Sequence, residues 1–198
     1  MTQDTINKLV RPEIRALKAY HVPPAQDLIK LDAMENPWSW SDDMRRAWLE
    51  TLHSVEINRY PDPAARDLQK ALREAMAVPD TAGVVLGNGS DELIQMIIQT
   101  VAAPGRIVLA PEPTFVMYRQ IAVVANMDYV GVPLANDFSI DEAAMLAALE
   151  QHQPAVTFLA YPNNPTGNLF DAGCLHNILS RASGLVVIDE AYAPFTDA

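Results

Sequence analysis

Two polar clusters follow apolar runs in the second half of the chain. Tyr-Pro-Asn-Asn-Pro-Thr-Gly at 161–167 comes after the run 155–160, and Asp-Glu-Ala-Tyr at 189–192 follows the run 185–188. Such runs are typical of buried parallel strands, and open α/β sheets bind ligands at the carboxyl ends of their strands. A carboxylate such as Asp189 is costly to bury without a cationic or hydrogen-bonding partner. The chemistry predicted here is the binding of a heteroaromatic group with a protonated ring nitrogen.

The spacing of the two clusters favours one shared site. Taken alone, Asn-Pro-Thr-Gly is a good turn, and an acidic pair after a strand can cap the next element. The stretch between Asn164 and Asp189 has room for one helix, over about 171–181, and one strand, which places both residues at the same sheet edge. Together with Tyr192, these residues indicate pyridoxal 5'-phosphate as the ligand.

A third segment predicts an anion site. Gly-Asn-Gly-Ser at 87–90 lies between a short apolar strand and an apolar-periodic helix, so unpaired backbone N–H groups are expected at the helix start. The same residues also describe a well-capped helix, with Ser90 as N-cap and Asp91 favourable to the helix dipole. The segment is not a dinucleotide-binding fingerprint, because Glu92 occupies the position of the third glycine.

The hydrophobic pattern predicts an α/β fold in which strands and helices alternate from Gly83 onward. An N-terminal arm over 1–30 precedes a domain over 31–198, which begins with a helix-rich connection at about 41–76. Strands are expected near 84–87, 106–110, 128–132, 155–160 and 185–189. Helices are expected near 91–102, 114–125, 141–151 and 171–181.

Seven ordered segments resemble the aspartate-aminotransferase-like superfamily of pyridoxal-phosphate enzymes (fold type I), and most closely the histidinol-phosphate aminotransferases. The segments are 9–20, 35–37, 59–63, 87–94, 111–118, 161–168 and 186–195. The resemblance implies the large domain of that fold, a mainly parallel sheet with flanking helices. It also implies transfer of an amino group between L-histidinol phosphate and 2-oxoglutarate in histidine biosynthesis. Alternatives are a threonine-phosphate decarboxylase or another fold type I aminotransferase.

The resemblance assigns cofactor contacts to four residues of the two strand-end clusters and the 111–118 segment. Asp189 pairs with the pyridine nitrogen and keeps it protonated, so that the ring withdraws electrons from the substrate. Asn164 and Tyr192 donate hydrogen bonds to the phenolate oxygen. Phe115 stacks on the ring face, although an ordinary core aromatic is an equally good interpretation of this residue.

Further contacts are implied for the phosphate and the substrate. Gly89, Ser90 and Asp91 hold the cofactor phosphate, and Tyr60 reaches the phosphate of the neighbouring subunit, which implies a homodimer. The family's N-terminal arm approaches the substrate, and the residues that match it are Tyr20, Glu35 and Asn36.

The family also has a lysine that binds the cofactor covalently, a few tens of residues after the Asp-Glu-Ala-Tyr motif. The last lysine of this sequence is Lys70, which matches no such motif. We therefore expect the chain to be the N-terminal part of a longer enzyme, truncated before the small C-terminal domain and inactive alone. The alternative of another class is a noncatalytic binding or interaction module.

Composition is consistent with a cytoplasmic metabolic enzyme. The formal net charge of −11 argues against nucleic acid and anionic membrane surfaces as partners. No apolar run is long enough for a signal peptide or a bilayer span. The single cysteine, Cys174, suits a reducing compartment and is interpreted as a packed thiol. The four histidines have no metal-ligand spacing and are expected at the surface, so no metal site is predicted.

Overall fold

The computed structural model describes residues 3–18, 29 and 35–196. They form two compact units. The first contains the described residues of 1–34 together with 87–196, and the second contains 35–86. Each unit is described by itself.

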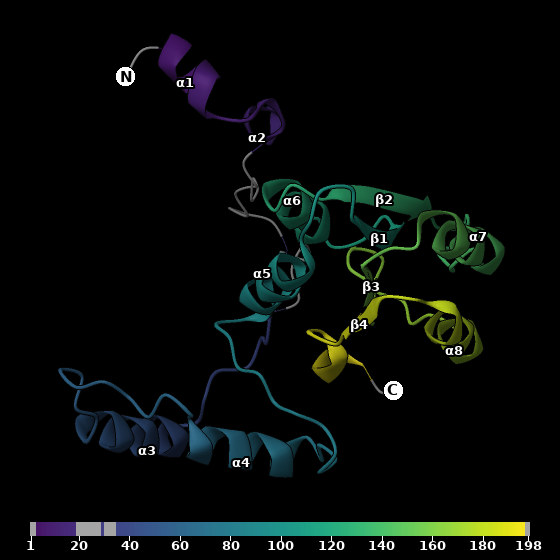
Figure 1. The fold of residues 1–198 in the computed structure, drawn as a ribbon. Coiled ribbons are helices and arrows are strands. Elements are labelled where there is room, and N and C mark those ends of the chain that lie inside the picture. The colour runs from purple at the N-terminus through teal and green to yellow at the C-terminus, as the bar shows by residue number, and fades with distance from the viewer. Residues whose placement is uncertain (1–2, 19–28, 30–34, 197–198) are drawn as a thin grey trace. The chain divides into compact units, whose positions relative to one another are not determined.

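The first unit is built around a parallel sheet with the strand order β2-β1-β3-β4 (Figure 1). The strands are β1 (Ile107–Glu112), β2 (Asp128–Pro133), β3 (Val156–Ala160) and β4 (Leu185–Asp189). They alternate with α5 (Ser90–Val101), α6 (Met117–Val124), α7 (Glu142–His152) and α8 (Ala172–Arg181). The short elements α1 (Gln3–Leu9), α2 (Pro12–Ala16) and η1 (Ala193–Phe195) lie near the chain ends. The predicted α/β class and the parallel sheet are confirmed.

The prediction of a strand at 84–87 is wrong. No segment of the described chain pairs with these residues, which have neither helical nor strand structure. An apolar run becomes a strand only when a neighbour accepts and donates its backbone hydrogen bonds, and this condition is not visible in a local pattern.

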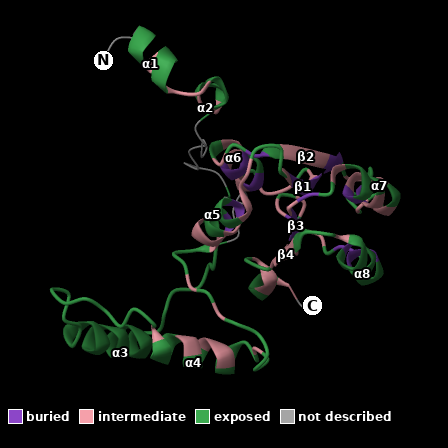
Figure 2. Cartoon of the chain, viewed as in Figure 1, coloured by how far each residue is buried: buried purple, intermediate pink, exposed green. Residues whose placement is uncertain are grey.

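Both faces of the sheet are covered, which explains why its strands are largely apolar, with Thr157 of β3 as a buried polar exception. Val156, Phe158 and Ala160 of β3 pack into the core cluster with α5 and α6, whereas Leu159 packs into the cluster with α7 and α8. Successive strand residues point to opposite faces, so a strand covered on both sides is apolar at most positions. Figure 2 shows the buried residues concentrated along the strands and the helix faces turned toward them.

Side-chain caps begin the two helices on the second face. Asp141 accepts a hydrogen bond from the Ala144 N–H at the start of α7, and Asp171 accepts one from the Cys174 N–H at the start of α8. Each bond satisfies an N–H group that lacks an intrahelical partner. Cys174 is buried on α8, as predicted for a packed thiol, and burial raises the pKa of its thiol.

The second unit contains α3 (Asp42–His53) and α4 (Arg66–Ala75), in agreement with the predicted helix-rich connection. None of its residues is buried. Large apolar side chains that are about half or more exposed include Trp38, Trp48, Leu49, Ile57 and Leu68. The unit therefore has no core of its own. No helix of the described residues is both long and apolar enough to cross a bilayer.

Candidate functional site

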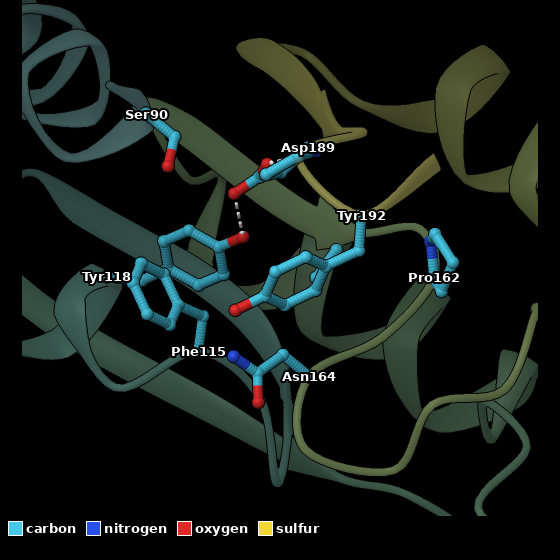
Figure 3. Close-up of a pocket in the computed structure, with 9 residues that line it drawn as sticks. Ser90, Phe115, Tyr118, Pro162, Asn164, Asp189 and Tyr192 are labelled. Carbon is cyan, nitrogen blue, oxygen red and sulfur yellow. Dashed lines mark hydrogen bonds between the residues drawn. The ribbon is translucent and has the colours of Figure 1, made fainter. Parts of the chain in front are cut away.

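A pocket lies at the carboxyl ends of three strands of the first unit (Figure 3). Phe115 follows β1, Asn164 follows β3, Asp189 is the last residue of β4, and Ser90 is the first residue of α5. The cavity is small, with a volume of about 80 Å³. The remaining lining residues are Tyr118, Ala160, Pro162, Ala191 and Tyr192. The sheet thus brings together the residues predicted from the two strand-end clusters.

The carboxylate of Asp189 is held by two donors. Its Oδ2 accepts a hydrogen bond of 2.7 Å from the Tyr118 hydroxyl, and its Oδ1 accepts one of 3.1 Å from the Ala191 N–H. A carboxylate has about four lone-pair positions, so capacity remains for a further donor. Figure 3 shows Asp189 at the pocket beside Tyr192 and Ser90. A cationic N–H group bound in the pocket is the kind of donor that suits this remaining capacity.

Tyr118 was not predicted as a site residue. Its side chain is fully buried, its ring stacks on Phe158 at 4.6 Å between centroids, and it meets Phe115 edge-on at 5.6 Å. Burial, and then the charge of Asp189, raise the pKa of Tyr118 well above its ordinary value, so its hydroxyl stays a donor. The available signal was a tyrosine one helical turn after Phe115, whose hydroxyl needs a partner when buried.

The two asparagines of the 161–167 loop have different surroundings. Asn163 is fully buried, and its Nδ2 donates to the Pro113 carbonyl at 3.0 Å and to the Thr166 hydroxyl at 2.7 Å. The Thr114 hydroxyl donates to Asn163 Oδ1 at 3.0 Å. Asn163 therefore joins the loop after β3 to the loop after β1. Asn164 instead lines the pocket, where its amide and the Tyr192 hydroxyl point into the same space.

The start of α5 differs slightly from the prediction. Gly89, not Ser90, is the N-cap residue, and Ser90 is the first helical residue. Gly89 has a φ of +84°, a conformation that glycine adopts readily and other residues rarely do. The Asn88 N–H donates to Glu92 Oε2 at 2.5 Å, whereas the first N–H groups of any helix have no partner inside it. Gly89, Ser90 and Asp91 remain the candidates for an anion.

Four other predicted site residues belong to the second unit or lie outside the described residues. Tyr60 is in the second unit with a fully exposed side chain. Glu35 and Asn36 are in the same unit, and Asn36 Oδ1 accepts the Trp38 N–H at 2.9 Å. Tyr20 lies outside the described residues. The roles predicted for these four residues therefore stay predictions.

The described residues contain no group of three or more His, Cys, Asp and Glu side chains that could hold a metal ion. His53 and His176 are exposed, as expected, and His152 is half-buried.

Comparisons with known proteins agree with this geometry. The family "Aminotransferase class I and II" matches residues 26–198. A histidinol-phosphate aminotransferase of Thiocapsa roseopersicina is 58% identical over 187 residues, which cover 94% of this chain and 99% of that protein. Histidinol-phosphate aminotransferase 2 of Nitrosococcus oceani is 57% identical over 195 residues, which cover 98% of this chain and 54% of that protein. This chain thus spans about half the length of the Nitrosococcus relative.

A solved structure supports the fold independently. The histidinol-phosphate aminotransferase of Sinorhizobium meliloti, determined in complex with pyridoxal 5'-phosphate, superposes with a TM-score of 0.76. The alignment covers 93% of this chain and 51% of that protein at 23% identity. Taken with the family match over most of the sequence, these findings confirm the predicted resemblance: the chain belongs to the class I and II aminotransferase family.

Proposed function

We propose that this chain forms the cofactor-binding part of a pyridoxal-phosphate-dependent aminotransferase. In this proposal the complete enzyme passes an amino group between L-histidinol phosphate and 2-oxoglutarate in histidine biosynthesis. The observation that carries the proposal is the Asp189 carboxylate at the end of β4, in a pocket shared with Phe115, Asn164 and Tyr192. The names of the relatives support the substrate pair.

The pocket residues fit the cofactor group by group. Asp189 has acceptor capacity for the protonated pyridine nitrogen, and the adjacent Phe115 ring offers an apolar face for stacking. The Asn164 amide and the Tyr192 hydroxyl share the same side of the pocket and are both hydrogen-bond donors. Such donors suit the phenolate oxygen of the ring.

The start of α5 suits the phosphate. Ser90 contributes a hydroxyl to the same pocket, and the first N–H groups of α5 are unpaired within the helix. Glu92 binds the Asn88 N–H, which leaves the N–H groups of Gly89, Ser90 and Asp91 for the anion. The helix dipole favours negative charge at this position.

When bound, the cofactor withdraws electrons from the α-carbon of an amino acid, so that its α-proton can be removed. Asp189 keeps the ring nitrogen charged, and the donors Asn164 and Tyr192 keep the ring in one orientation. The described lysines Lys8, Lys18 and Lys70 are exposed and outside the pocket lining. The lysine that moves the proton is therefore proposed for another part of the complete enzyme.

The proposal includes a homodimer. The second unit exposes many large apolar side chains and has no buried residue, which is typical of a surface covered by another chain. Tyr60 is fully exposed within it and is the residue proposed to reach the partner's phosphate. Both units would belong to one large domain.

We also propose a cytoplasmic location, because the lone cysteine, Cys174, is a buried free thiol.

The test is an assay of the protein expressed from its complete reading frame. We expect amino transfer between L-histidinol phosphate and 2-oxoglutarate, and loss of activity in Asp189→Ala. The matched control is Asp137→Ala, which removes an exposed carboxylate outside the pocket and should keep the activity. Faster decarboxylation of O-phospho-L-threonine would favour the decarboxylase, and the absence of cofactor binding would favour a noncatalytic module.

A further inference from the structure

The carboxylate of Asp189 in the pocket accepts a hydrogen bond from a buried residue of the core. Asp189 Oδ2 accepts the Tyr118 hydroxyl at 2.7 Å, and Tyr118 is completely enclosed by the core on α6. The residues lie 71 positions apart, on different elements. Because Tyr118 packs against Phe158 and Phe115, its ring has little freedom to turn away. The hydroxyl is therefore a fixed donor to the carboxylate.

We propose that Tyr118 is a positioning residue that keeps Asp189 ionised and directed at the cofactor ring. This inference rests on the proposed function, in which Asp189 pairs with the pyridine nitrogen. The proton of such a pair can lie on the nitrogen or on the carboxylate, and each hydrogen bond donated to the carboxylate favours its charged form. Tyr118 and the Ala191 N–H donate one bond each, so together they favour the proton on the nitrogen.

The position of Tyr118 gives it a second effect. A carboxylate held through both oxygens cannot rotate freely, so the remaining lone pairs keep one direction. Phe115 meets the Tyr118 ring edge-on, and both line the pocket. The short segment 115–118, which leads into α6, thus positions both the proposed stacking ring and the hydrogen-bond donor to the proposed ion pair.

The experiment uses the complete enzyme with pyridoxamine 5'-phosphate labelled with ¹⁵N in the ring. This probe has the ring and phosphate of the cofactor but no aldehyde, so it binds reversibly. In the wild type, the ¹⁵N chemical shift should report a protonated ring nitrogen. In Tyr118→Phe, which keeps the aromatic packing and removes only the hydroxyl, the shift should move toward that of neutral pyridine. The kcat should fall roughly tenfold, as expected for loss of one hydrogen bond to a charged group.

A double-mutant cycle separates this role from a general structural one. In the Asp189→Ala background, Tyr118→Phe should leave the ¹⁵N shift unchanged, because the carboxylate through which it acts is gone. The matched control is Tyr129→Phe, which removes a half-buried tyrosine hydroxyl that lies near another carboxylate, that of Glu112, outside this pocket. It should behave as wild type. Incorporation of 4-aminophenylalanine at position 118 restores a donor and should restore the wild-type shift.

The outcomes are distinct. An unchanged ¹⁵N shift in folded Tyr118→Phe overturns the inference and leaves the proposed function intact. If Tyr118→Phe does not fold, the test is made on the protein with 4-aminophenylalanine at position 118. A ¹⁵N shift far from the wild-type value in that protein also overturns the inference. Failure of the wild-type protein to bind the probe, or a shift that is the same in Asp189→Ala, overturns the proposed function itself.

Discussion

At the scale of single residues, the site contains pairs in which one residue faces the pocket and a second residue fixes its position by hydrogen bonds. Asp189 faces the pocket and Tyr118 holds its carboxylate, while Asn164 faces the pocket and Asn163 ties down its loop. The holding residues are fully buried. Since buried polar groups must be satisfied, a substitution of a holding residue should disturb geometry as well as chemistry.

Replacement of Asp189 by alanine should lower turnover far more than cofactor affinity. The charge on the ring nitrogen matters most in the transition state, whereas phosphate, stacking and donor contacts remain in the ground state. Steady-state kinetics of the complete enzyme at saturating cofactor should show the loss in kcat. An unchanged kcat would contradict the role given to Asp189.

Alkaline pH should destabilise the protein through the buried Tyr118 and the half-buried Tyr129. Burial raises the pKa of Tyr118 and of Tyr129, so the folded state keeps both protonated after the unfolded chain begins to lose these protons near pH 10. Their contribution to the free energy of unfolding is therefore fully present below about pH 10. Above that pH it is lost, at up to about 1.4 kcal/mol per pH unit for Tyr118.

Denaturant unfolding between pH 8 and pH 11 would measure this effect, with phenolate absorbance followed in parallel. Tyr118→Phe should flatten the dependence. Ionisation of all tyrosines near pH 10 without unfolding would contradict the prediction.

At the scale of elements, the strand order decides which loops meet. β3 lies between β1 and β4, so the carboxyl ends of these strands, near Phe115, Asn164 and Asp189, lie beside one another. The close approach of β3 and β4 begins at Gly184, where an added Cβ would lie 2.2 Å from the Pro154 carbonyl oxygen. That oxygen belongs to the backbone, so no side-chain rotation can move it away.

Gly184→Ala should therefore destabilise the protein by about 2–3 kcal/mol, because the two strands must separate where they begin to pair. It should also lower the kcat of the complete enzyme, since Asp189 ends the displaced strand. The matched control is Gly83→Ala, where an added Cβ meets nothing within 4 Å. Denaturant titration of both variants would check the prediction, and equal stability of the two would contradict it.

At the scale of the whole molecule, two compact units carry the proposed site residues. The first contains the pocket, and the second contains Tyr60 on a surface rich in exposed apolar side chains. If a dimer forms as proposed, each site combines Asp189 from one chain with Tyr60 from the other. Loss of one residue could then be complemented by the partner chain.

Mixing Tyr60→Ala and Asp189→Ala subunits should restore activity that neither variant has alone. A mixed dimer holds one site with both residues intact, and random pairing makes half of the dimers mixed, so about a quarter of wild-type activity is expected. Activity should be measured after subunit exchange in mild denaturant, with each variant alone as the control. The absence of any recovery in confirmed mixed dimers would place Tyr60 in its own chain's site.

Much of this organisation was present in the sequence. The apolar runs predicted the four strands of the sheet, and the polar clusters after them predicted Asp189, Asn164 and Tyr192 as neighbours. Both inferences depend on local patterns, because a strand buried on both faces must be apolar and parallel strands end at one edge. The motifs that carry the family resemblance are local as well.

Tertiary structure alone decided the rest. The sequence motif selected Asn164, which lines the pocket, but gave no partner for Asn163, which donates to the Pro113 carbonyl 50 residues away. Tyr118 meets Asp189 only because α6 packs against the β3 core, and residues 84–87 are not a strand because no neighbour pairs with them. Hydrogen-bond partners distant in the chain are chosen by packing, and a local pattern contains no information about them.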